Sequence, residues 1–149
     1  MFKIFLGLHL LTAIFLIGPL AHAVTTASRG LRTGDAAATT ASARMARVYA
    51  IGSLLVVVLG FGLMSLDSPF TGQPAGEFTD LWIWLSVLLW VVAVALTMGV
   101  VAPTLDRATA AIGRGEAVQQ LTGRVAAAGG TIGLIFVAIV FLMVYRPGS

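Results

Sequence analysis

Long runs of apolar residues constrain this chain more than any other feature of its sequence. The clearest run extends from Leu81 to Ala102, and no charged residue occurs between Asp80 and Asp106. At about 1.5 Å of rise per residue, such a run forms a helix roughly 33 Å long, which matches the bilayer hydrocarbon core of about 30 Å. Because lipid offers the backbone no hydrogen-bond partners, the run must satisfy its own peptide groups. We therefore expect a transmembrane helix here.

Three other apolar runs have the same character, so the fold class is predicted to be all-α, a four-helix transmembrane bundle in one domain over residues 1–149. The predicted helices cover about residues 3–27, 45–66, 80–102 and 124–145. Pro19 predicts a kink in the first helix, and Pro103 predicts the end of the third. The first run ends like a secretory signal, at Ala21-His22-Ala23, but the arginines that follow favour an uncleaved helix.

The connecting segments are predicted from their composition. Residues 28–42 are rich in small and polar side chains and predict a loop, as do residues 104–123. Residues 67–79 carry two prolines and two glycines and predict an exposed turn.

Composition excludes several classes of function. Hydrophobic residues make up 58% of the chain and charged residues 10%, whereas soluble domains carry about 25% charge. The nine basic residues lie in short connections and form no basic helix face, which argues against a nucleic-acid partner. The chain has no cysteine, so a disulfide, a thiolate metal site and a catalytic thiol are excluded.

The basic residues also predict the orientation in the membrane. Lys3 and Arg146 lie on one predicted side, and seven arginines lie on the other: Arg29, Arg32, Arg44, Arg47, Arg107, Arg114 and Arg124. Because Lys and Arg are retained on the cytoplasmic side, we expect both termini outside the cell. Each half of the chain then starts and ends outside, so the halves can be aligned as two parallel helical hairpins. Convergence of two Arg-Gly-acid turns also explains this likeness, and we slightly favour it.

His9 is the first candidate for chemistry, because an ionisable side chain within an apolar span is costly to place there. Met64 and Met143 end their helices on the same predicted side, so an imidazole and two thioethers could bind Cu(I) or haem iron as a metal site. The alternative is a histidine hydrogen-bonded to a neighbouring oxygen, with the methionines as packing residues. We favour this alternative because no second His, Cys or carboxylate lies at that depth.

Other catalytic or transport functions have less support from the sequence. No Asp, Glu, Lys or Arg lies deep in a predicted span, which argues against a proton-coupled transporter or a charge-selective pore. Ser53, Ser65 and Ser86 have no paired base and acid at the same membrane depth, so we expect no enzyme and no catalytic residues.

Small and basic residues predict contacts with other helices and with lipid. Helix-packing faces are predicted at Gly60, Gly62, Gly129 and Gly133, with a further pair at Ala126 and Gly130. Contacts with anionic lipid headgroups, each worth on the order of 1 kcal/mol, are predicted for Arg29, Arg32, Arg44 and Arg47. The retention of positive charge on the cytoplasmic side explains these arginines equally well.

Specific residues carry a resemblance to a known family. The stretch Leu8-His9-Leu10-Leu11, the glycine-rich second helix and the closing residues 140–147 resemble a bacterial family of small four-helix integral membrane proteins of unknown function. Copper-resistance proteins and four-helix protoporphyrinogen oxidases, which have a histidine early in the first helix, are distantly similar. The oxidases pair that histidine, here His9, with a lysine in the third helix, and this chain has none there.

The chain also resembles an accessory membrane protein found with respiratory supercomplexes of high-GC Gram-positive bacteria, in which cytochrome bcc and an aa3-type oxidase are joined. This resemblance implies a bacterial plasma membrane, with lipids and other membrane subunits as partners. The function predicted is therefore that of a non-enzymatic accessory or assembly subunit of a larger membrane complex, without a cofactor. The alternative is a redox or metal-handling protein that binds haem or copper at His9.

Overall fold

The computed structural model describes residues 1–148 and confirms the predicted fold class. Within these residues four helices are long and apolar enough to cross a membrane: Phe2–Thr33, Ala36–Met64, Leu81–Gly113 and Gln119–Tyr145. No strand occurs in the described part of the chain, where only an isolated bridge joins Asp67 to Pro74. Ser149, the last residue of the predicted domain, lies outside the described residues.

Each span consists of several helical segments. The first contains α1 (Phe2–Thr12), the π-helical η1 (Ala13–Ile17), α2 (Gly18–Thr26) and α3 (Ser28–Thr33). The second contains α4 (Ala36–Gly52) and α5 (Leu54–Met64). The third contains α6 (Leu81–Leu96), the π-helical η2 (Thr97–Val101) and α7 (Ala102–Gly113). The fourth contains the 3₁₀ turn η3 (Gln119–Leu121) and α8 (Thr122–Tyr145).

The prediction of a loop over residues 28–42 is wrong, because most of this segment is helical. The chain turns only at Gly34 and Asp35. Gly34 has a φ of 64°, the left-handed conformation in which glycine commonly ends a helix. Asp35 begins α4, and its carboxylate accepts hydrogen bonds from the backbone N–H groups of Ala37 (2.9 Å) and Ala38 (3.0 Å). Alanine, the strongest helix former, then outweighs the threonines and serine that follow.

The predicted end of the third helix near Pro103 is also wrong, since the helix continues to Gly113. Pro103 lies at the start of α7, directly after the π-helical η2. A proline inside a continuous helix removes one backbone hydrogen bond and clashes with the preceding turn, and here that turn is π-helical, so the regular hydrogen-bond pattern changes just before the proline. The first span repeats this arrangement, with η1 directly before Pro19 at the start of α2. In both spans the helix therefore accommodates its proline by a local change from α-helix to π-helix just before it.

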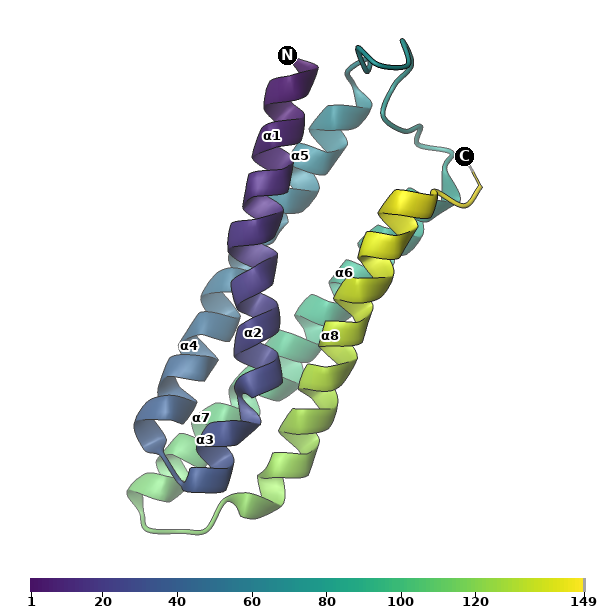
Figure 1. Ribbon diagram of the computed structural model, residues 1–149. Helices are drawn as coiled ribbons and strands as arrows, with labels where there is room; N and C mark the ends of the chain where they lie inside the picture. Colours follow the sequence, from purple (N-terminus) through teal and green to yellow (C-terminus); the bar gives the residue numbers. More distant parts are fainter. Residues whose placement is uncertain (149) are drawn as a thin grey trace.

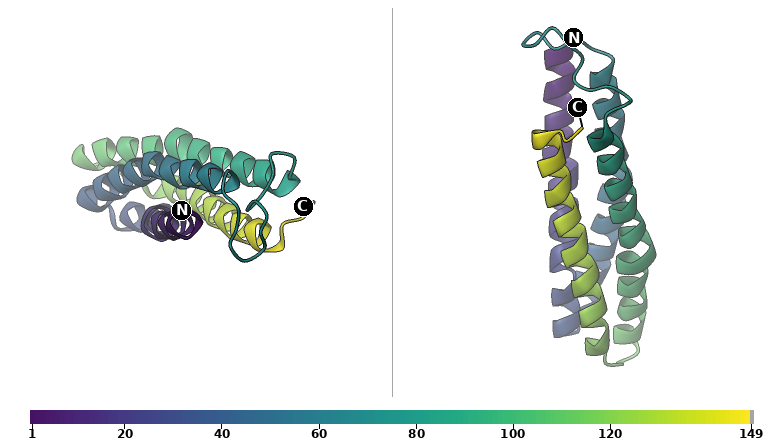
Figure 2. Two further views of the ribbon diagram at one scale, coloured as in Figure 1. Left: turned by 90° about the horizontal axis from the view of Figure 1, so that it is seen from above. Right: turned by 90° about the vertical axis from the view of Figure 1, so that its right-hand side faces the viewer.

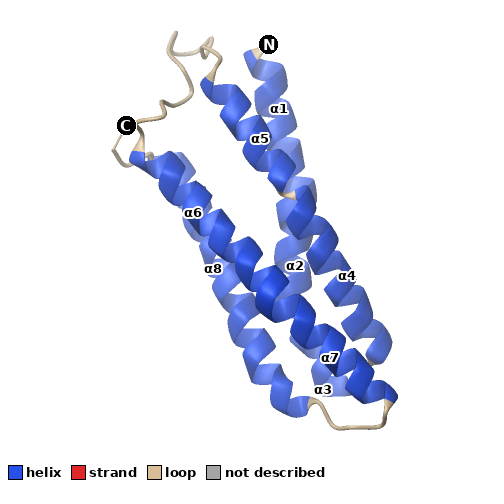
Figure 3. Cartoon of the chain, turned by 180° about the vertical axis from the view of Figure 1, so that it is seen from behind, coloured by secondary structure: helices blue, strands red, loops and turns tan. Residues whose placement is uncertain are grey.

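The four spans pack together at one end and separate into two pairs at the other (Figure 1). At the first end, here named the closed end, α4 packs on α7, and α2 packs on both α8 and α4. At the second, the open end, α1 packs along α5 and α6 packs along the last part of α8. These two pairs diverge, as the view from behind also shows (Figure 3). Both termini lie at the open end (Figures 1 and 2).

The buried core lies mainly in the closed end. Its fully buried large apolar side chains include Leu20, Val24, Leu31, Leu105, Val125 and Ile132. Ala43, Ala46 and Ala50 form a buried row on α4, and such small side chains let a neighbouring helix approach closely. The open end differs, because α1 contains no buried residue.

The closest crossing in the closed end depends on Gly129 of α8. A Cβ atom at this position would collide with the carbonyl oxygen of Val24 in α2. One helical turn further, a Cβ at Gly133 would lie 3.3 Å from the Thr25 Cγ2 atom. Gly130 is different, because a Cβ there would meet no atom within 4 Å. Of these two adjacent glycines, Gly129 therefore packs against another helix and Gly130 faces open space.

This contrast predicts different effects of the same substitution at Gly129 and Gly130. G129A should lower the free energy of unfolding by about 1–3 kcal/mol, because the added methyl group forces α8 away from α2. G130A should leave stability unchanged or raise it by up to about 1 kcal/mol, because alanine favours a helix over glycine. Thermal unfolding in detergent micelles, followed by circular dichroism, would measure both. Equal effects of the two substitutions would contradict the crossing described.

Candidate functional site

His9 lies where α1 packs on α5. Its Nδ1 atom is 2.9 Å from the backbone carbonyl oxygen of Val56 and hydrogen-bonds to it. Glycine makes room for this ring, because a Cβ at Gly60 would lie 3.2 Å from the His9 Cε1 atom. One turn along α1, the Phe5 ring occupies the same kind of space at Gly62. The two glycines of α5 thus receive two rings of α1, and one of these rings is polar.

The two methionines predicted beside His9 have different positions. Met64 follows Gly60 by one turn of α5, on nearly the same side of that helix, and is partly buried. Met143 lies near the end of α8, which is separated from α1 at the open end (Figure 1). The structure therefore does not bring the three predicted donors together. Within residues 1–148, no three His, Asp or Glu side chains gather into a group that could hold a metal ion.

Of the four arginines predicted to contact lipid, Arg47 has a partner within the protein. Its guanidinium group forms a bidentate ion pair with the Asp106 carboxylate of α7, with 3.2 Å between Nη1 and Oδ1. Arg29, Arg32 and Arg44 are exposed, and the described residues supply no ion pair for them. All four belong to the closed end. The arginines that are open to headgroups are therefore Arg29, Arg32 and Arg44.

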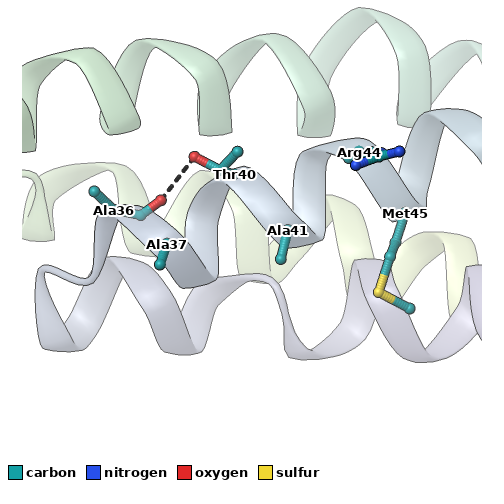
Figure 4. Close-up of a pocket in the computed structure, with 6 residues that line it drawn as sticks. All are labelled: Ala36, Ala37, Thr40, Ala41, Arg44 and Met45. Carbon is teal, nitrogen blue, oxygen red and sulfur yellow. Dashed lines mark hydrogen bonds between the residues drawn. The ribbon is translucent and has the colours of Figure 1, made fainter.

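A shallow open groove follows α4 beside Arg44 (Figure 4). Ala37, Ala41 and Met45 recur every four residues and point to one side of the helix, away from the Arg44 guanidinium group. The Thr40 hydroxyl donates a hydrogen bond of 2.8 Å to the Ala36 carbonyl oxygen, so it is already engaged. The groove offers an apolar surface of small side chains with one cation beside it.

The second connection at the closed end contains a solvent-exposed ion pair. Arg114 Nε donates to Glu116 Oε1 at 2.6 Å, and Arg114 Nη2 donates to Glu116 Oε2 at 3.2 Å. These charge-assisted hydrogen bonds lower the pKa of Glu116. The sequence analysis used Arg114 only for the orientation and did not predict this pair, which links two residues of one turn.

Several polar contacts between helices were missing from the sequence analysis. Trp90 Nε1 donates to Ser53 Oγ at 2.9 Å, and Ser53 Oγ donates to the Ala50 carbonyl oxygen at 2.6 Å. The hydroxyl groups of Thr39 and Thr109 share a hydrogen bond of 2.7 Å between α4 and α7. A signal for the first contact existed, because an indole N–H within a span needs an acceptor, and Ser53 is a hydroxyl in the middle of the second apolar run.

Aromatic rings join the connection over residues 65–80 to the open end. The Phe61 ring of α5 stacks on Phe78 with 6.2 Å between ring centroids and lies 6.3 Å from the Trp84 ring of α6. Trp84 Nε1 donates to the Phe78 carbonyl oxygen at 2.8 Å. The Lys3 ammonium group lies 5.6 Å from the centroid of the Phe70 ring. This connection therefore bridges the two diverging pairs.

These features define a class, the four-helix integral membrane protein. The chain belongs to the DUF2269 family of predicted integral membrane proteins, whose model matches residues 3–147. No curated protein and no solved structure matches it. The family match confirms the predicted resemblance to a family of integral membrane proteins, whereas the association with a respiratory supercomplex stays a prediction.

The free arginines predict a measurable difference in lipid binding. R29Q and R32Q should each weaken the retention of anionic phospholipid about fivefold, because each exposed arginine contributes on the order of 1 kcal/mol. R47Q is the matched control and should change retention little, because Arg47 is engaged with Asp106. Native mass spectrometry of protein released from nanodiscs of mixed anionic and neutral lipid would count the bound lipids. A loss in R47Q as large as in R29Q would contradict this assignment.

Proposed function

We propose that this chain is a non-enzymatic subunit of a larger membrane complex, held there by lateral contacts of its open end. The observation that carries the proposal is the division of the bundle into a packed closed end and two diverging helix pairs (Figure 1). A closed end with a continuous core gives the subunit its stability. The open end then leaves helix surfaces available to another subunit.

The surfaces of the open end fit such a role. No side chain of α1 is buried within the chain, and on α8 Val140 is 58% exposed and Val144 is 70% exposed. Lipid chains can cover exposed apolar side chains as well as a protein can, so only the shape of the helix surface can favour a protein partner. An apolar groove between α6 and α8 supplies such a shape, lined by Leu85, Leu89, Ala138, Phe141, Leu142, Tyr145 and Pro147. A ridge of side chains from a neighbouring membrane helix can pack into a groove of this kind.

Small residues in the first part of α8, nearer the closed end, offer a second contact surface in addition to the open end. Gly123, Ala127 and Gly130 are exposed, and a Cβ at Gly123 or Gly130 would meet no atom within 4 Å. Exposed small residues at such spacing allow another membrane helix to approach closely. The respiratory supercomplex of cytochrome bcc and an aa3-type oxidase is the partner to test first, on the strength of the sequence resemblance.

The non-enzymatic part of the proposal is supported by how the polar side chains are engaged. The Ser53 and Ser86 hydroxyls donate to backbone carbonyl oxygens, of Ala50 at 2.6 Å and Trp82 at 2.7 Å. Neither hydroxyl is hydrogen-bonded to a base, as an activated nucleophile would be. The side chains at these positions therefore serve helix packing.

Crosslinking tests the lateral contact. A photoreactive benzoylphenylalanine in place of Val140 should form adducts with another membrane protein when native membranes are irradiated, because this position is exposed on α8. The adjacent Ile139 is buried and provides the matched control, from which no such adduct is expected. Adducts from both positions with lipid alone would contradict the proposal. So would migration of the protein alone, at 15.5 kDa, after solubilisation in mild detergent.

We also propose that the closed end lies on the cytoplasmic side of a bacterial plasma membrane, with both termini outside. The support is the charge distribution, since seven arginines lie in the parts of the spans that meet at this end or in the turn between them, and Lys3 and Arg146 lie at the other end. The acidic residues Asp67, Glu77 and Asp80 would then face outward.

Cysteine labelling tests this orientation directly, because the chain has no cysteine of its own. T71C, in the connection at the open end, should react with a membrane-impermeant maleimide added to intact cells. A117C, in the exposed turn at the closed end, should react only after the membrane is permeabilised. The reverse pattern would place the arginines outside and overturn the proposed orientation.

A further inference from the structure

We propose that α1 and α5 form a movable arm, which swings as one unit about a hinge at η1 and at Gly52–Ser53. The other helical segments form the body of the molecule. A latch of three aromatic side chains, Phe61, Phe78 and Trp84, holds the arm beside α6 in the observed position. The motion of the arm does not depend on whether the chain is a subunit of a larger complex.

The arm takes no part in the core of the molecule. Within residues 1–148, the cluster of buried apolar side chains draws on α2, α3, α4, α6, α7 and α8 but on neither α1 nor α5. α1 packs on α5, and no other helix packs on either of them to a similar extent. The body differs, because α2 packs on α4 and α8 while α4 packs on α7. The arm can therefore move without disturbing the core of the closed end.

The two helices of the arm are held to each other by specific contacts. His9 Nδ1 hydrogen-bonds to the Val56 carbonyl oxygen at 2.9 Å, and the rings of His9 and Phe5 lie against Gly60 and Gly62 of α5. Because these contacts lie within the arm, a swing leaves them intact. We therefore expect α1 and α5 to move together.

The first part of the hinge is η1. Sharp changes of helix direction occur at π-helical turns and at prolines, and η1 directly precedes Pro19. None of the five residues of η1 is buried. The second π-helical segment, η2, is the contrast, because its Thr97 and Val101 are fully buried and it packs on α4 and α8. Of these two segments, only η1 is therefore free to change its bend.

The second part of the hinge separates α4 from α5. α4 ends at Gly52 and α5 begins at Leu54, an interruption that is visible from behind (Figure 3). The Ser53 hydroxyl donates to the Ala50 carbonyl oxygen at 2.6 Å, and hydroxyl groups bonded in this way often bend a helix. The Val56 N–H donates to the Ser53 carbonyl oxygen, three residues back, at 3.0 Å, whereas an α-helix joins residues four apart. The regular hydrogen-bond pattern thus changes here as well.

The two interruptions lie side by side, as a common hinge requires. A Cβ atom at Gly52 would lie 3.3 Å from the Leu16 Cδ2 atom, so η1 contacts the end of α4. Trp90 Nε1 of α6 donates to Ser53 Oγ at 2.9 Å, which attaches the hinge to the body. Both connections of the arm to the body can therefore bend at one level, and that level is anchored.

The latch lies at the far end of the arm from the hinge. Phe61 of α5 stacks on Phe78 with 6.2 Å between ring centroids, and its ring lies 6.3 Å from that of Trp84 in α6. Trp84 Nε1 donates to the Phe78 carbonyl oxygen at 2.8 Å, so these two residues stay together when Phe61 leaves them. One side chain of the arm thus makes the aromatic contacts with the latch. Its removal should release the arm.

Distance measurements between pairs of spin labels in nanodiscs test the proposal, because the chain has no cysteine of its own. I4C on α1 and L134C on α8 report the arm against the body, and both positions are exposed. Ile4 lies about 13 Å from η1 along the helix, so a change of about 20° in the bend moves it by about 5 Å. F61A should therefore shift or broaden the distribution of this distance by about 5 Å.

Two further variants separate the latch from a general effect of losing an aromatic ring. W84L removes the other side of the same contact and should act as F61A does. F141A is the matched control, because Phe141 stacks on Tyr145 within α8 at 6.0 Å and belongs to the body. It should leave the distance unchanged. Circular dichroism and size-exclusion chromatography would establish that each variant keeps the fold.

Two more label pairs distinguish a swing of the whole arm from local disorder. L8C with V58C lies within the arm, V48C with L134C lies within the body, and all four positions are exposed. Both distances should stay the same in F61A. Unchanged I4C–L134C distances in folded F61A and W84L would overturn the proposal, as would equal effects of F61A and F141A. So would a change of the distance within the arm as large as that between arm and body, because α1 and α5 would then move separately.

Discussion

The close crossing of α8 over α2 at Gly129 is the contact on which the arrangement of the four helices depends. Lipid chains are as apolar as leucine, so burial of apolar surface does not drive membrane helices together, and van der Waals packing must do so. Gly129 lets the backbone of α8 reach the carbonyl oxygen of Val24, and the alanines of α4 similarly admit α7. Small residues therefore hold the closed end together.

The same principle explains the open end. Along α1 and α6 the side chains are mostly leucine, isoleucine, valine and aromatic residues, which keep backbones apart. The pair α1/α5 still forms, because Gly60 and Gly62 receive the rings of His9 and Phe5. The distribution of glycine and alanine thus determines both the stable part of the molecule and the part available for contacts.

Much of the fold followed from sequence, and the errors have one physical cause. The apolar cores of the four spans are correct, because the length of a hydrocarbon-crossing helix is a local property. The ends are wrong at residues 28–42 and after Pro103, because the helices continue beyond the apolar runs. There, helix caps such as Asp35 and a change of helix type before Pro103 determine where a helix stops. Hydropathy contains no information on either feature.

The sequence by itself determined that the chain is helical and has four spans fit to cross a membrane, that most of its arginines lie toward the same ends of these spans, and that one histidine lies within a span. Only the tertiary structure decided that Gly129 faces a neighbouring backbone while Gly130 does not, that Arg47 pairs with Asp106, and that α8, which contains Met143, separates from α1, which contains His9, at the open end. These outcomes depend on the rotation and register of each helix. Both are set by the packing of all four spans at once, which no single stretch of sequence specifies.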